Sequence, residues 1–239
     1  MAVFRLDKFL TSSGLGTRSE VKTLIKHGKI TLNGEIIKKS DQKIDSDVDL
    51  VCFEGKKITY ISHLYLMLNK PKGVVSATED NISATVIDLI KEGKHLNLFP
   101  VGRLDKDTEG LLLITNDGDL AHNLLSPKKH INKKYYVELD SMVTLEIIKV
   151  LEEGVDLEEF VTMPSKIETT NDPRKLYITI QEGKFHQVKR MFKAVGVEVT
   201  YLKRMSMGSL VLDKSLAPGK YRELTKEELN KLKGDKHDK

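Results

Sequence analysis

Apolar residues at helical spacing predict two short helices near the start of the chain. Leu6, Phe9 and Leu10 indicate the first of them. The second runs from Thr17, which forms a capping-box pattern with a glutamate three residues on, to Gly28, a residue type that often ends helices. Two short strands at 30–32 and 35–37, joined by an Asn-Gly pair, then predict a β-hairpin.

Strand and helix patterns alternate over the rest of the chain without long helical crossovers. An apolar strand is predicted at 65–70, where a Pro-Gly turn stops it. Further strands are predicted at 74–78, 95–101, 111–115, 135–139, 176–180 and 197–203. Helices are predicted at 86–91, 120–125, 145–153 and 185–195, with a short last one starting at 225. Many strands with few long crossovers predict an α+β fold with a mainly antiparallel sheet.

A polar stretch at 60–63 divides the two patterns. We therefore expect a small domain over 1–62, a larger one over 63–233, and a disordered tail over 234–239. No apolar run reaches the roughly 18 residues of a membrane span, and the N-terminus lacks the apolar core of a signal peptide. We expect a cytoplasmic protein that does not bind membranes.

Cysteine usage and charge narrow the function classes. Cys52 is the single cysteine, so an internal disulfide is excluded, and the sequence shows no Cys/His cluster with zinc spacing. Residues 1–43 carry a net charge of +5, whereas the whole chain carries +4. A basic front on a near-neutral body predicts a module that binds a polyanion, although a solvated charged face would have the same composition.

The front unit resembles the S4 RNA-binding domain. The resemblance rests on three motifs: Arg5-Leu6-Asp7-Lys8-Phe9-Leu10, Thr17-Arg18-Ser19-Glu20 and Lys29-Ile30-Thr31-Leu32-Asn33-Gly34. It covers about the first 60 residues and implies binding of structured RNA, not a reaction. The RNA contacts that we expect from this unit are Arg5, Lys8, Arg18, Lys22, Lys26 and Asn33.

An acidic loop over residues 102–110 leads into the buried strand at 111–115. Asp105, Asp107 and Glu109 stand at the spacing of a calcium loop, but position 12 is Asn116 instead of glutamate, and the flanks read as strands. A purely structural turn is a second interpretation, which suits Asp107 and Glu109. The third is that a rigid carboxylate, Asp105, performs chemistry.

Four blocks in order resemble the RsuA/RluB-type pseudouridine synthases. They begin at Met67, Gly102, Lys133 and Glu182, and the S4 domain in front belongs to the same layout. Residues 183–192 and the ending at 218–225 are most similar to the RsuA branch, which modifies small-subunit ribosomal RNA.

The resemblance implies roles for particular residues. Asp105 would be the reacting carboxylate, Tyr135 would stack on the uracil, and Lys189 would pair with Asp105. Arg190 is the alternative partner, because neighbouring helical residues point about 100° apart. His186 fits a structural or RNA-contacting role. Further RNA contacts are expected from Arg103, Lys70, Lys72, Gln187 and Arg190. Lys184 and Arg204 are basic residues around the cleft that could hold phosphates.

Together these observations predict a monomeric enzyme that isomerises a uridine of 16S ribosomal RNA. Its substrate would be either naked RNA or a small-subunit assembly particle. The reaction it implies needs no cofactor and no metal. The alternatives are a 23S-directed enzyme of the RluB-like branch, a non-enzymatic S4-type ribosome-assembly factor, and an S4-bearing methyltransferase. The acidic loop argues against the second, because phosphate binding gives no reason to gather acids. The third would need a Gly-rich cofactor loop, and the sequence shows none.

Overall fold

The computed structural model describes residues 3–60 and 62–234. It divides into two compact units, one of residues 1–64 with 91–97 and one of residues 65–90 with 98–239. The second unit thus begins two residues after the sequence-predicted boundary. Part of the predicted linker, Ile61, and most of the predicted tail, 235–239, lie outside the described residues, while Gly234 is the last residue of a helix. In the described part of the chain, no helix is long and apolar enough to cross a bilayer.

The first unit packs two helices on short strands. Its elements are β1 (Val3–Arg5), α1 (Leu6–Ser12), α2 (Arg18–Lys26), β2 (Ile30–Leu32), β3 (Glu35–Ile36), β4 (Lys43–Asp45), β5 (Val51–Phe53), β6 (Lys56–Lys57) and the 3₁₀ turn η1 (Lys94–Leu96). The strands form one sheet in the order β3-β2-β5-β6 and a separate β1-β4 pair. The predicted helices and hairpin are confirmed. Thr17 caps α2 in a complete capping box with Glu20, and both turn residues have positive φ, 53° at Asn33 and 90° at Gly34.

The second unit is built around one large sheet. Its strands are β7 (Tyr65–Lys70), β8 (Phe99–Pro100), β9 (Glu109–Thr115), β10 (Lys133–Leu139), β11 (Lys166–Thr169), β12 (Lys175–Ile180), β13 (Val199–Met207), β14 (Leu210–Val211) and β15 (Tyr221–Glu223). Its helices are α3 (Gly118–Leu125), α4 (Leu145–Glu153), α5 (Gln187–Ala194) and α6 (Lys226–Gly234), with the 3₁₀ turn η2 (Pro127–Lys129). The α+β class with a mainly antiparallel sheet is therefore confirmed.

Two antiparallel halves of this sheet meet at one short parallel pairing. The order is β11-β12-β10-β13-β9-β7-β15, and only β13 and β9 run parallel. That pairing places Arg204 opposite Gly110. A Cβ on Gly110 would lie 2.3 Å from the Arg204 carbonyl oxygen, so only glycine lets the two strands approach this closely. The acidic loop precedes β9 and therefore ends at this junction.

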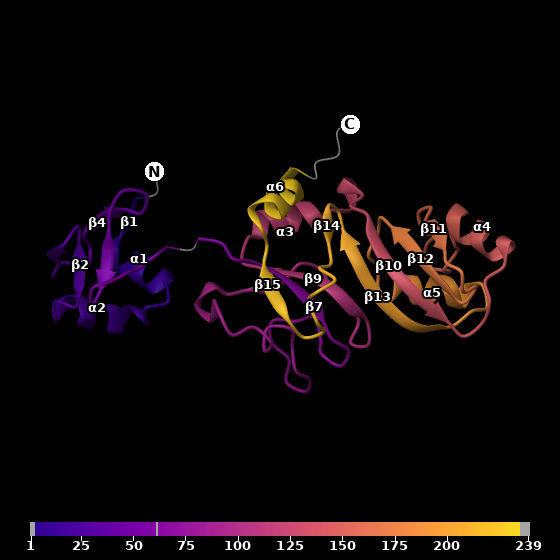
Figure 1. Cartoon of the computed structure of the whole chain (residues 1–239), viewed down its shortest axis with the longest axis horizontal. Coiled ribbons are helices and arrows are strands. Elements are labelled where there is room, and N and C mark those ends of the chain that lie inside the picture. Colours follow the sequence, from indigo (N-terminus) through magenta and orange to yellow (C-terminus); the bar gives the residue numbers. More distant parts are fainter. Residues whose placement is uncertain (1–2, 61, 235–239) are drawn as a thin grey trace. The chain divides into compact units, whose positions relative to one another are not determined.

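Helices cover each half of the sheet separately. In Figure 1, α3 and α6 lie together beside the β15-β7-β9 half, and α4 and α5 accompany the β10-β12 half. Leu120 and Leu124 of α3 and Leu232 of α6 share one buried cluster with Met67 and Leu113 of the sheet. On α5, Val188, Met191 and Phe192 are buried. The burial of apolar faces on both halves leaves the junction between them as the place where polar side chains meet.

Three sequence predictions differ from the structure. The predicted strand at 74–78 makes a single bridge, between Val75 and Thr85, and the predicted helix at 86–91 is a turn. The Asp88 carboxylate accepts hydrogen bonds from the backbone N–H and hydroxyl of Thr85, at 2.7 and 3.0 Å, which closes the chain locally in place of a helix. The predicted strand at 95–101 is reduced to β8.

Candidate active site

A buried lysine shapes the acidic loop. Lys70, at the end of β7, is fully buried, and its Nζ donates to the carbonyl oxygens of Asp105 (3.0 Å) and Thr108 (2.8 Å), with longer contacts to those of Pro71 and Lys106. Burial lowers the Lys70 pKa to about 8, against the opposing charges of the loop acids. The prediction that Lys70 contacts RNA is wrong, because its side chain is fully buried and its ammonium donates to backbone carbonyl oxygens.

Asp105 faces two basic groups at the start of α5, Lys189 on the helix and His186 just before it. Its Oδ2 lies 3.3 Å from Lys189 Nζ, and its Oδ1 lies 3.5 Å from His186 Nε2. The Asp105 side chain remains 23% exposed, so a substrate can reach it. Arg190 points elsewhere, to Glu159 Oε2 (3.2 Å) and the Leu157 carbonyl (3.1 Å). Lys189 rather than Arg190 is therefore the partner of Asp105.

The other two acids of the loop have separate partners. Asp107 Oδ1 accepts a hydrogen bond from Lys189 Nζ at 2.5 Å. Burial acts to raise the Asp107 pKa, but this bond and the Lys189 charge outweigh it and hold the pKa below its ordinary value. Glu109 Oε2 accepts from the Tyr201 hydroxyl at 2.7 Å. Asp105 and Asp107 thus share the Lys189 ammonium, whereas Glu109 has a different partner. Among the described residues no group of three or more His, Cys, Asp and Glu could hold a metal ion, which argues against the calcium interpretation.

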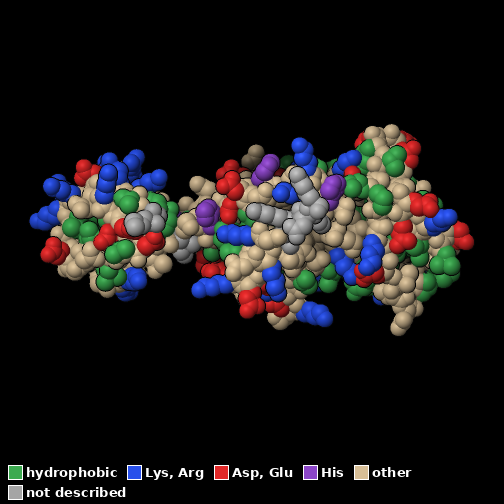
Figure 2. All heavy atoms as spheres, turned by 90° about the horizontal axis from the view of Figure 1, so that it is seen from above, with side chains coloured by type: hydrophobic (Ala, Val, Ile, Leu, Met, Phe, Trp, Pro, Cys, Tyr) green, Lys and Arg blue, Asp and Glu red, His purple; other side chains and the backbone are tan. Residues whose placement is uncertain are grey.

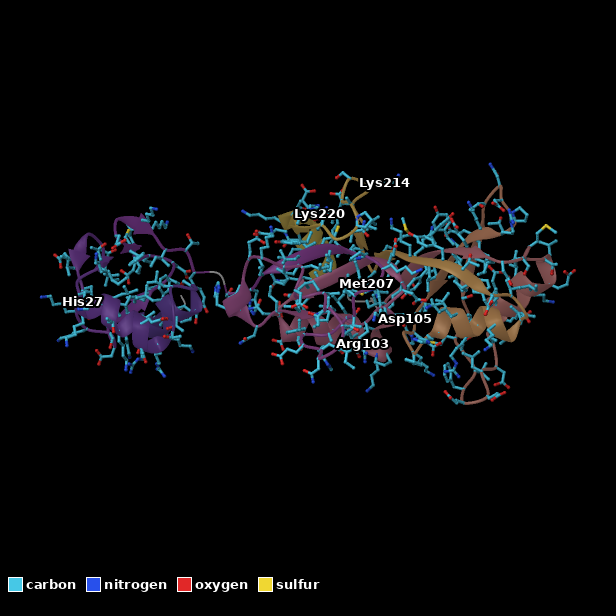
Figure 3. The ribbon with its side chains drawn as sticks, turned by 90° about the horizontal axis from the view of Figure 1, so that it is seen from below. His27, Arg103, Asp105, Met207, Lys214 and Lys220 are labelled. Carbon is cyan, nitrogen blue, oxygen red and sulfur yellow. The ribbon has the colours of Figure 1, made fainter. Side chains whose placement is uncertain are left out.

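Tyr135 and Asp105 line the same pocket. Tyr135 lies on β10, where the register with β13 shifts, and is 7% exposed. Arg103, Lys184 and His186 also line this pocket. Figure 3 shows Arg103 and Asp105 close together on the loop before β9. The structure thus gathers the predicted trio of Asp105, Tyr135 and Lys189 at the junction of the sheet halves.

The start of α5 is fixed by a side chain that we expected to bind RNA. Gln187 is 3% exposed. Its Oε1 accepts from the Lys184 backbone N–H (3.0 Å), and its Nε2 donates to Glu182 Oε2 (2.9 Å). Gln187 therefore holds the start of α5 in place and also lines the Asp105 pocket, and the RNA contact predicted for it stays a prediction. His186, just before it, has a φ of 49°, which is why α5 begins at 187 and not at 185.

The remaining predicted contacts fall into exposed and engaged groups. Arg103 and Lys72 are exposed in the second unit, and Lys8, Lys22 and Lys26 are exposed in the first. Figure 2 shows Lys and Arg side chains gathered on the first unit. The engaged group is Arg5 and Arg18, on the buried Asp7 carboxylate, and Asn33, whose amide bonds Asp49 and the Leu50 N–H.

Sequence reasoning did not identify two features near the pocket. His186 contacts Asp105, and its ring stacks on the exposed Phe185 at a centroid distance of 3.8 Å. Lys133 is buried on the same face of β10 as Tyr135. The signal was available for Lys133, because residues two apart on a strand share a face.

Comparison with known proteins agrees with this architecture. The sequence profile of the RNA pseudouridylate synthase family matches residues 64–194, and that of the S4 domain matches residues 4–50. An uncharacterized RNA pseudouridine synthase of Bacillus subtilis is 53% identical, with 95% of this chain and 98% of the relative covered. Ribosomal small subunit pseudouridine synthase A of Vibrio vulnificus is 40% identical, with coverage of 95% and 99%.

A solved structure extends the likeness to the fold. A crystal structure of a pseudouridylate synthase superposes with a TM-score of 0.68 at 40% identity, covering 96% of this chain and 99% of that one. The relatives and this structure match nearly the whole length of the chain, and the two profiles match residues 4–50 and 64–194. The chain belongs to the RsuA/RluB-type RNA pseudouridine synthases, enzymes that carry an S4 domain ahead of the catalytic domain.

Proposed function

We propose that this enzyme converts a specific uridine of 16S ribosomal RNA to pseudouridine, with Asp105 as the reacting carboxylate. The observation that carries the proposal is the partly exposed Asp105, paired with Lys189 in a pocket that Tyr135 also lines. The choice of RNA is supported by relatives named ribosomal small subunit pseudouridine synthase A. A ribosomal substrate also supports a cytoplasmic place of action.

The reaction is an isomerisation that the residues of this pocket suit. The N1–C1′ bond of the uridine breaks, the uracil turns, and a C5–C1′ bond forms; the C5 proton leaves and N1 gains one, so atoms and electrons balance within the substrate. Asp105 would act on the ribose, either by attack at C1′ or as a base. Lys189 places a positive charge 3.3 Å from Asp105 Oδ2 and fixes the orientation of this carboxylate.

Tyr135 and Arg103 would hold the displaced nucleotide. An enzyme that acts on C1′ and C5 must take the base out of its stack, and a detached uracil needs a surface that keeps it in place while it turns. The buried ring of Tyr135 offers a flat wall of the pocket. Arg103 is exposed at the same pocket, where its guanidinium can contact the RNA from which the base is taken.

Pseudouridine mapping tests the proposal directly. Purified protein is incubated with protein-free 16S RNA, with a small-subunit assembly particle and with 23S RNA, and each uridine is then scored for isomerisation. We expect one modified position, in 16S RNA or its particle, which is absent when the Asp105→Asn variant is used. Modification confined to 23S RNA would support the RluB-like alternative, and no modification in any RNA would contradict the proposal.

A further inference from the structure

A second cavity adjoins the Asp105 pocket. It has a volume of about 290 Å³ and shares Arg103, Tyr135 and Lys184 with that pocket. Lys133 and Arg204 also line it. The volume is close to the lower end of small-molecule sites, which is enough for one nucleotide unit.

Arg204 brings an unsatisfied donor to this cavity. The residue is 2% exposed, and its Nε donates to the Leu111 carbonyl oxygen at 2.8 Å. Its Nη2 has no hydrogen-bond partner among the described residues. A guanidinium does not lose its proton in a protein, so a buried donor without a partner is costly unless a ligand supplies an acceptor.

Lys133 adds a second buried cation. It is 8% exposed, and its Nζ donates to the carbonyl oxygens of Ile131 (3.0 Å) and Gln181 (3.3 Å). Burial and the neighbouring Arg204 charge lower its pKa to about 8, so it is still mostly charged at neutral pH.

The positive charge of this cavity is not balanced from within the protein. Glu182 is the one carboxylate in its lining. That carboxylate already accepts from the Met163 N–H (2.9 Å) and from Gln187 Nε2 (2.9 Å), and Lys184 lies 3.6 Å from it. Two buried cations and a free guanidinium N–H in one cavity are the features of an anion site.

We propose that Arg204 and Lys133 bind a phosphate group of the substrate RNA, on one side of the uridine that faces Asp105. The inference rests on the proposed function only in taking RNA as the substrate. Phosphate is the anion that every nucleotide carries, and the shared wall at Tyr135 places the cavity next to the pocket that would hold the reacting base.

Neutral linkages in the RNA test this assignment. A 16S fragment that wild type modifies is synthesised with a single methylphosphonate, in turn, at each of the two linkages on either side of the target uridine. kcat/KM is measured for wild type, Lys133→Met, Lys133→Arg and the control Lys214→Met. Lys214 is exposed, lines neither cavity, and lies away from Asp105 in Figure 3. If the proposed function were wrong, wild type would not modify the unaltered fragment, so that failure is distinguished from failure of the phosphate assignment.

We expect one neutral linkage to lower kcat/KM of wild type by roughly ten- to a hundredfold, the range for a lost charge-assisted contact. On unaltered RNA, Lys133→Met should lower kcat/KM by a similar factor. On RNA that carries this neutral linkage, the kcat/KM of Lys133→Met should fall little further. Lys133→Arg and Lys214→Met keep the cation at position 133, so the neutral linkage should still lower their kcat/KM. If the losses from Lys133→Met and from the neutral linkage multiplied, the two would act independently and the proposal would be overturned. It would also be overturned if no neutral linkage lowered the kcat/KM of wild type. The scan of neutral linkages uses wild-type protein, so it tests the proposal even where a variant is unstable. Arg204→Lys is a second variant of the same site.

Discussion

Lys189 lies between two carboxylates that are not equivalent. Asp107 makes the shorter contact, 2.5 Å against 3.3 Å for Asp105, and its side chain is 58% exposed. Asp105 is more enclosed and lines the pocket. The arrangement suits a division of work, in which Asp107 holds the ammonium in place and Asp105 remains directed at the substrate.

The first prediction separates these two acids. Asp105→Asn should lower the rate of pseudouridine formation at least about a hundredfold, because an amide is neither a base nor a comparable nucleophile. Asp107→Asn should cost less than about tenfold, because Lys189 still faces Asp105. Single-turnover assays measure both rates, and RNA titrations with each variant should give nearly unchanged affinity. Equal losses for the two variants would remove the distinction.

The second prediction concerns Lys70 and the stability of the acidic loop. Lys70→Met keeps a side chain of similar length but leaves the carbonyl oxygens of Asp105 and Thr108 without their hydrogen-bond donor. We expect a loss of about 2–4 kcal/mol in the free energy of unfolding, together with most of the activity. Lys72→Met, two residues away and exposed, is the matched control and should change stability by less than about 0.5 kcal/mol. Urea denaturation distinguishes the two.

Residue types were easier to predict than residue surroundings. The sequence blocks that contain Asp105, Tyr135 and Lys189 occur in the same order as in the family they resemble. The meeting of these three residues in one site could therefore be predicted. Lys70 and Gln187 are polar residues of the same sequence blocks, but the structure buries both. The carbonyl oxygens that bind the Lys70 ammonium come from another segment of the chain. The Lys70 contact spans 35 residues of sequence. Local pattern contains no information on such a contact.

At the scale of elements, local signals predicted those elements that local interactions stabilise. The capping box of α2 is written in the sequence and is present in full. The segment 86–91 has an apolar pattern, and Val86 and Ile90 are indeed buried, but six residues form too short a helix to repay its nucleation. The hydrogen bonds from Thr85 to the Asp88 carboxylate close this segment as a turn instead.

The third prediction is for a contact that ties three elements of the first unit together. The buried Asp7 at the start of α1 accepts from Arg5 of β1 at 3.0 and 3.1 Å, and Arg18 of α2 lies 3.7 Å away. Asp7→Asn should reduce the stability of this unit by about 1–3 kcal/mol at neutral pH. Asp41→Asn, at an exposed site, is the control. Thermal unfolding followed by circular dichroism measures the difference.

The pH dependence of this effect has a defined sign. The Arg5 hydrogen bonds lower the Asp7 pKa in the folded state below its ordinary value of 3.8. Its stabilisation is therefore complete above about pH 3.8 and is lost as pH falls through the lower folded value. The difference between wild type and Asp7→Asn should shrink over that acid range. A difference that stays constant down to pH 2 would show that the ionised carboxylate contributes nothing.

At the scale of the whole molecule, charge and chemistry are carried by different units. Residues 1–43 carry +5 within a chain of +4, so the rest is slightly negative. Several cations of the catalytic unit are buried or paired near the site, as Lys70, Lys133 and Lys189 illustrate, whereas Arg103 is exposed there. We therefore expect long-range attraction of RNA to come mainly from the S4 domain, and contacts to the transition state from the catalytic domain.

The last prediction tests this division in the intact protein. Lys8, Lys22 and Lys26 are exposed on the S4 domain, and their simultaneous replacement by Ala should weaken RNA binding while leaving the rate at saturating RNA close to that of wild type. Each lost phosphate contact should reduce the slope of log K against log salt concentration by roughly 0.7–0.9, so the three together should reduce it by about 2–3. The control replaces the exposed Lys214, Lys226 and Lys231, which removes the same net charge from the catalytic unit. An equal change of slope in both triple variants would mean that net charge alone attracts the RNA, and a lower saturating rate in the first would place part of the chemistry in the S4 domain.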